Sequence, residues 1–165
     1  MKPTFQGNPV TLAGNILKIG DLAPEVSLPS KDLSDVKIGG ASGKYQIVNF
    51  LPSLDTGVCA MQTKKFNTEA SKLSNAQVFV VSMDLPFAQG RFCSTEGIEN
   101  LVVASDFRAK EFGNKYGVLI DDSVLKGLLA RGVIVVDPEG KIIYEEIVSE
   151  ITNEPNYQAV LDLFK

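Results

Sequence analysis

The sequence predicts an α/β fold with one central mixed β-sheet flanked by helices. Apolar runs at 45–51 and 78–83 enclose a segment of helical periodicity, which indicates a parallel β-α-β unit. Two further apolar runs, 133–136 and 141–144, are joined by a short turn and must therefore be antiparallel. A last helical segment, 156–164, follows this pair.

Length and composition predict one globular domain over residues 1–165. The hydrophobic share of 44% and the charged share of 22% are ordinary for such a domain. A net charge of −4 argues against nucleic acid as a partner, and no apolar run is long enough to cross a membrane. The first residues lack the pattern of a secretory signal, so a cytoplasmic location is expected.

The chain begins with a predicted β-hairpin, whose strands 4–6 and 10–12 are joined by Gly7-Asn8-Pro9. A looser segment around Pro24 and Pro29 follows. The run 45–51 ends at Pro52, as is typical of a buried strand, and a helix is predicted over 58–73.

Three shorter elements separate the two halves of the sheet. They are a short helix or turn at 86–93, a strand at 101–104 and a helix at 107–116. The resulting order is β-α-β followed by β-β-α, which is the order of a thioredoxin-like mixed sheet.

The composition also excludes several kinds of enzyme. The chain has no histidine and two cysteines. Ser-His-Asp and Cys-His catalysis, and metal sites with histidine ligands, are therefore excluded, and two cysteines cannot complete a Cys₄ site. No cofactor is expected. The chemistry must come from carboxylates, Lys, Arg, Tyr, hydroxyls, backbone amides or a thiol.

Cys59 lies where a buried strand gives way to the first turn of a helix. Chemistry gathers at such strand ends in α/β sheets, and the helix N-terminus favours a thiolate over a thiol. Thr56 can cap the helix or donate its hydroxyl toward the sulfur. Pro52 restricts the turn and removes a competing amide donor. Against this hypothesis stands the common role of cysteine as a small buried apolar residue.

The second thiol, Cys93, has two interpretations. A C-x-x-C redox motif is excluded, because Thr56 occupies the position where the other cysteine would stand. Cys93 follows the next strand along the chain, so it can lie near the same end of the sheet as Cys59. From the residues alone, inert packing and a redox partnership with Cys59 both remain open.

Other candidate motifs are weaker. The segment Gly39-Gly40-Ala41-Ser42-Gly43-Lys44 partly matches a phosphate-binding loop, but it lacks the first glycine and the final Ser or Thr, and it precedes a strand. Asp121-Asp122 and Glu145-Glu146 could ligate a cation, yet no calcium-loop spacing surrounds them. These segments are expected to form surface turns and solvated charge pairs.

The pattern Pro52-x-x-x-Thr56-x-x-Cys59 resembles the active-site motif of the peroxiredoxin family. The match is closer to its bacterial thiol peroxidase branch, the atypical two-cysteine peroxiredoxins, and it extends over nearly the whole chain. The other matching segments are 5–11, 31–36, 84–89, 91–93, 125–128 and 150–152.

This resemblance implies a role for each matching residue. Cys59 would be the peroxidatic cysteine, in a pocket shaped by Pro52 and Thr56. Arg131 would be the active-site arginine, and Cys93 the resolving cysteine of an intrachain disulfide. The resemblance also implies a thioredoxin-like fold, a hydroperoxide substrate that is often an alkyl hydroperoxide, thioredoxin as the reductant, and a homodimer.

Elementary chemistry is consistent with these roles. A thiolate attacks one peroxide oxygen while negative charge develops on the other, so donors directed at the departing oxygen lower the barrier. Arg131 supplies a permanent charge with a planar fork of N–H groups, and Thr56 supplies a hydroxyl. The resulting sulfenic acid condenses with a second thiol.

Three other functions are alternatives to the peroxidase. A peroxide sensor would use the same thiol but pass the oxidation to a partner protein. A thioredoxin-fold binding module would merely pack its cysteines in the core. A glutathione peroxidase is a weaker rival, because its usual site includes tryptophan and this chain has none.

Overall fold

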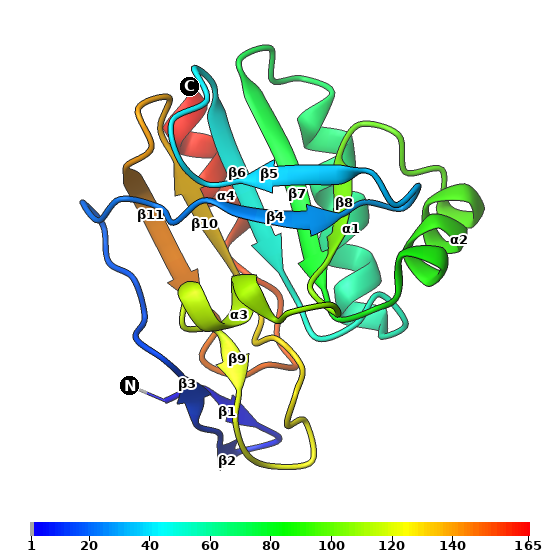
Figure 1. Cartoon of the computed structure of the whole chain (residues 1–165), viewed down its shortest axis with the longest axis vertical. Coiled ribbons are helices and arrows are strands. Elements are labelled where there is room, and N and C mark those ends of the chain that lie inside the picture. Colours follow the sequence, from blue (N-terminus) through cyan, green and yellow to red (C-terminus); the bar gives the residue numbers. More distant parts are fainter. Residues whose placement is uncertain (1) are drawn as a thin grey trace.

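The computed structural model describes residues 2–165 and contains a central five-stranded mixed sheet (Figure 1). Its strand order is β11-β10-β6-β7-β8. The strands are β6 (Tyr45–Phe50), β7 (Ala76–Ser82), β8 (Val102–Ser105), β10 (Gly132–Val136) and β11 (Ile142–Ile147). Strands β6, β7 and β8 are parallel, whereas β10 is antiparallel to both of its neighbours. The predicted thioredoxin-like mixed sheet is confirmed.

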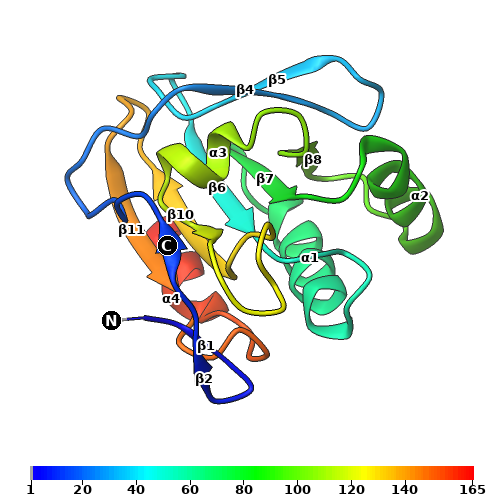
Figure 2. The ribbon, with the colours of Figure 1, turned by 60° about the horizontal axis from the view of Figure 1, so that its bottom comes forward.

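Helices and a second strand pair cover both faces of this sheet. Figure 2 shows α1 and α4 on one face, and a hairpin of β4 and β5 together with α3 on the other. These elements are α1 (Gly57–Ala70), α2 (Pro86–Glu96), α3 (Glu111–Lys115), α4 (Tyr157–Leu161), β4 (Val26–Pro29) and β5 (Asp35–Ile38). The short helix α2 packs beside the edge strand β8.

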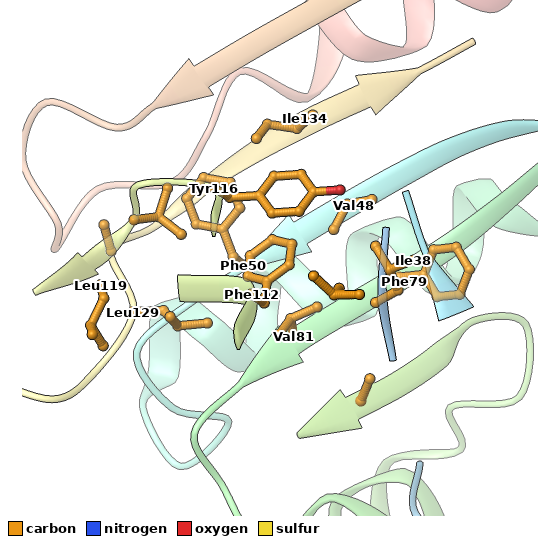
Figure 3. Packing of buried hydrophobic residues seen from close by; sticks show 14 of the residues in the cluster. Ile38, Val48, Phe50, Phe79, Val81, Phe112, Tyr116, Leu119, Leu129 and Ile134 are labelled. Carbon is orange, nitrogen blue, oxygen red and sulfur yellow. The ribbon is translucent and has the colours of Figure 1, made fainter. Parts of the chain in front are cut away.

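The sheet separates two apolar clusters. The first lies under α3 and the β4–β5 hairpin, where the rings of Phe112 and Tyr116 stack at 4.3 Å and Phe50 packs against Phe112 (Figure 3). The second lies under α1 and α4 and contains both cysteines, Cys59 and Cys93. Strand β10 contributes alternate residues to each cluster, because successive side chains of a strand point to opposite faces.

The predicted N-terminal hairpin is present, but the prediction of its strands was wrong. Strand β1 (Thr4–Phe5) pairs with β2 (Asn8–Pro9), so the chain reverses earlier than expected. The reason is that Gln6 and Gly7 both take positive φ, at 51° and 84°, which suits a two-residue hairpin turn. The following strand, β3 (Leu12–Ala13), leaves the hairpin and pairs with β9 (Leu119–Ile120).

Two other expectations also required correction. The segment around Pro24 and Pro29 is not loose, because β4 pairs with β5 and buries Val26 and Leu28 while Ser27 stays exposed. The helix predicted over 107–116 is limited to α3. Its start is delayed because the carboxylate of Asp106 accepts hydrogen bonds from the amides of Phe112 and Gly113, with Lys110 at a φ of 52°.

The remaining predicted elements are confirmed with small shifts at their ends. Among residues 2–165, no helix is long and apolar enough to cross a membrane.

Gly132 shows how tightly β10 is packed where the chain leaves Arg131. A Cβ atom at this position would lie 2.1 Å from the carbonyl oxygen of Glu146 and 2.5 Å from the ring of Phe50. The first of these neighbours is backbone of the paired strand β11, which cannot rotate away. The glycine therefore lets the sheet and the Phe50 ring close around the start of β10.

Replacing Gly132 with alanine is expected to lower the free energy of unfolding by about 2–3 kcal/mol, because the added methyl group overpacks a rigid site. Urea denaturation measures this change. Gly57→Ala is the matched control, since its Cβ would meet nothing within 4 Å and a helix favours alanine. Equal stability of Gly132→Ala and wild type would contradict the proposed packing.

Candidate active site

Cys59 occupies the first turn of α1 and is fully buried. Strand β6 ends at Phe50, and the chain turns through Pro52 before the helix begins. Thr56 is the N-cap, and its hydroxyl oxygen accepts the amide of Cys59 at 3.4 Å. The same hydroxyl donates to the carbonyl of Ser53 at 3.2 Å. Of the two roles foreseen for Thr56, the structure shows the cap and not a bond to the sulfur.

Arg131 brings a cation to this thiol from the other half of the chain. Its Nη1 lies 3.0 Å from the sulfur of Cys59 and 3.2 Å from Oε1 of Gln62. Its Nε donates to the carbonyl of Ile151 at 2.7 Å, and its own carbonyl accepts the amide of Val148. Only 2% of Arg131 is exposed. Three partners therefore fix one buried guanidinium beside Cys59.

Sequence reasoning missed a buried polar network behind the arginine. Gln62 donates through Nε2 to Oδ1 of Asn49 at 3.2 Å and to the carbonyl of Gly132 at 3.4 Å. Asn49 in turn donates to the carbonyl of Phe79. Polar Asn49 in the mostly apolar run 45–51 was a signal available in the sequence, because buried polar side chains need partners.

Asp84 is a second residue that sequence reasoning did not assign. Its carboxylate accepts hydrogen bonds from the hydroxyl of Ser53 at 2.7 Å, the amide of Leu54 at 2.8 Å and the hydroxyl of Ser82 at 2.7 Å. The loop before α1 is thus tied to the end of β7. These three hydrogen bonds hold in place the turn that precedes α1 and Cys59.

A cavity of about 320 Å³ opens beside the first turn of α1. Its lining includes Arg131, Pro52 and Thr56, together with Gly57 and Val58 of the first turn of α1. The rest of the lining is mainly apolar and comes from distant segments, namely Phe5, Leu125, Leu128 and Ile151. The structure therefore places Pro52, Thr56 and Arg131 around one cavity, next to the turn that carries Cys59.

Cys93 lies on α2, and the structure does not bring it to this cavity. It lines a separate cavity of about 220 Å³ beside the β4–β5 turn. Burial raises the pKa of the Cys93 thiol, and the nearby Lys31 ammonium opposes this shift only in part. Both cysteines are free. Cys93 is therefore held as a neutral thiol, whereas Cys59 faces a guanidinium.

The described residues, 2–165, contain no cluster of three or more Cys, Asp or Glu side chains that could hold a metal ion. The segment that partly matches a phosphate-binding loop does not contribute to the cavity beside α1. Gly39 and Gly40 form part of a glycine-rich turn held by the buried side chain of Gln46.

Comparison with known proteins assigns this geometry to a family. The family model described as Redoxin matches residues 18–161. The chain belongs to the redoxin family. A thiol peroxidase of Campylobacter jejuni is 59% identical over 97% of this chain and 90% of its own length. One of Aquifex aeolicus is 52% identical, over 98% and 95%. This redoxin is accordingly a peroxidase, an oxidoreductase that reduces peroxides with a thiol.

Solved structures share the fold of this chain. A peroxiredoxin-like protein from Aquifex aeolicus superimposes with a TM-score of 0.96 at 51% identity, over 98% of this chain and 94% of its own. A thiol peroxidase from Chromobacterium violaceum gives a TM-score of 0.89 at 19% identity, over 99% and 95% of the two chains. The second likeness concerns the fold alone.

Thr56→Val is expected to lower the free energy of unfolding by about 1 kcal/mol, because valine cannot accept the Cys59 amide at the helix N-terminus. Thr56→Ser keeps the capping oxygen and should lie close to wild type. Urea denaturation of the two variants makes the comparison. Equal losses in both would show that the hydroxyl does not cap α1.

Proposed function

We propose that Cys59 is the thiol that attacks the peroxide, with Arg131 as its electrostatic partner. The observation that carries this proposal is the 3.0 Å contact between Nη1 of Arg131 and the sulfur of Cys59 in a buried site. A charge-assisted hydrogen bond of this kind stabilises a thiolate, and low exposure strengthens it. No histidine is needed as a base once the sulfur is ionised.

In the proposed reaction the Cys59 thiolate attacks the nearer oxygen of the hydroperoxide. The S–O bond forms as the O–O bond breaks, and the departing alkoxide or hydroxide takes up a proton to leave as an alcohol or water. Arg131 lines the cavity through which the peroxide enters, so its N–H groups can stabilise the charge that develops on the departing oxygen. Cys59 becomes a sulfenic acid.

We further propose that Cys93 resolves this sulfenic acid. Its thiol attacks the Cys59 sulfur, and water leaves as an intrachain disulfide forms. The two cysteines are buried on different helices and are both free, so we propose that α1, α2 or both unwind locally when the bridge forms. Helix α2 suits such a change because it has no side-chain N-cap and packs mainly against one edge strand.

The remaining parts of the proposal rest on the family. Thioredoxin would reduce the disulfide, and the functional unit would be a homodimer. The apolar wall formed by Phe5, Leu125 and Leu128 fits the organic group of an alkyl hydroperoxide. Transient disulfide chemistry at two free thiols fits a reducing compartment, the cytoplasm.

Cys59→Ser should abolish peroxide turnover, because a serine hydroxyl is not ionised at neutral pH and cannot form the sulfenic acid. The measurement is peroxide consumption in the presence of reduced thioredoxin. Circular dichroism confirms that the variant is folded. Turnover at the wild-type rate would remove Cys59 from the reaction.

Cys93→Ser should still consume a single equivalent of peroxide per chain but fail to cycle with thioredoxin, because no intrachain disulfide can form. Intact mass after peroxide treatment should show an oxidised Cys59 in this variant and a mass loss of two hydrogens in wild type. Unchanged cycling in Cys93→Ser would show that Cys93 is not the resolving thiol.

A further inference from the structure

The carboxylate of Glu150 collects donors from two segments that are far apart in the sequence. Its Oε1 accepts the hydroxyl of Thr4 at 2.9 Å and the amide of Gly7 at 2.8 Å. Its Oε2 accepts the amide of Gln6 at 3.1 Å, and the amide and hydroxyl of Thr152 at 3.1 and 2.8 Å. Both carboxylate oxygens are needed to accept these five hydrogen bonds, because two go to Oε1 and three go to Oε2. A side-chain amide offers only one acceptor oxygen.

This carboxylate fastens the N-terminal hairpin to the segment that follows β11. Figures 1 and 2 both show β1 and β2 beside that segment. Backbone bonds complete the junction: the amide of Thr4 donates to the carbonyl of Ser149 at 2.7 Å, and the amide of Ile151 donates to the carbonyl of Thr4 at 2.8 Å. Ile151 is therefore held on its amide side by the hairpin.

The carbonyl oxygen of Ile151 binds Arg131. The oxygen of Ile151 accepts Nε of Arg131 at 2.7 Å, while Nη1 of that guanidinium contacts the sulfur of Cys59. A guanidinium is planar, so fixing Nε and Nη1 together fixes the plane of the whole group. An unbroken series of contacts therefore runs from the hairpin through Ile151 to the sulfur.

We propose that Glu150 is a positioning residue for peroxide reduction, because its carboxylate locks the hairpin against residues 149–152 and so keeps Arg131 directed at Cys59. Glu150 itself neither contacts the sulfur nor lines the cavity, although Thr152, which donates to its carboxylate, is part of the lining. Its effect on the reaction is transmitted through Ile151. The inference deepens the proposed role of Arg131 and rests on it.

The test is the rate at which hydrogen peroxide oxidises Cys59 in the full chain carrying Cys93→Ser, where the reaction stops after one step. Quenched-flow intact mass follows the product, since the chain has no tryptophan to report by fluorescence. Glu150→Gln should slow the oxidation about tenfold, the effect of losing about one charged hydrogen bond from the transition state. Glu139→Gln, an exposed glutamate in the β10–β11 turn, is the matched control and should not change the rate.

A double-mutant cycle separates positioning from general stability. In chains that already carry Arg131→Ala, Glu150→Gln should slow the oxidation no further, because no guanidinium remains to be directed. A purely structural role would give the same slowing in both backgrounds, and that result would overturn the proposal. An unchanged rate in Glu150→Gln alone would also overturn it. If Arg131→Ala itself does not slow the oxidation, the assignment of Arg131 fails first and this inference fails with it.

A milder variant keeps the test open if Glu150→Gln does not fold. Thr4→Val removes a single donor to Glu150 with little change in side-chain volume. It should slow the oxidation about threefold, and again only when Arg131 is present. Thermal unfolding of every variant shows that the chains compared are folded at the temperature of the assay. Slowing by Thr4→Val that is independent of Arg131 would count against the proposal.

Discussion

The contact between the guanidinium of Arg131 and the sulfur of Cys59 is the constraint around which the site is organised. A cation with 2% exposure is costly unless its donors are paired. Here three partners come from two parts of the chain: Cys59 and Gln62 on α1, and the carbonyl of Ile151 after β11. These contacts pair the donors of a guanidinium that would otherwise be a costly buried charge.

Much of this arrangement could be predicted because its signals are local. The apolar run at 45–51, its termination at Pro52 and the helical periodicity beyond it placed Cys59 at a helix start without any knowledge of the rest of the chain. Arg131 was assigned through the family motif, since nothing in the sequence around it shows which residue it will contact. The structure brings the two side chains together, whereas Cys93 stays on a separate helix and lines another cavity.

The parts that escaped prediction depend on contacts between distant residues. The carbonyl of Ile151 carries no side-chain signal, because every residue has a backbone oxygen. Gln62 resembles any polar residue of a helix until Arg131 and Asn49 are seen on either side of it. The hairpin strands were misplaced because Asn8 and Pro9 are typical turn residues, yet positive φ at Gln6 and Gly7 makes the turn earlier. The need for glycine at position 132 became clear only from the carbonyl of Glu146 and the ring of Phe50.

The two apolar clusters lie on opposite sides of the sheet, and this separation limits how much of the fold must change during turnover. Both thiols belong to the cluster under α1 and α4, whereas the stacked rings of Phe112 and Tyr116 belong to the other. Local unwinding at the start of α1, the helix that carries Cys59, would therefore open the cluster that holds the thiols and leave the stacked rings in place. The opposite layer and the sheet would persist as a scaffold, so the reaction can repeat without the chain having to fold afresh after each turnover.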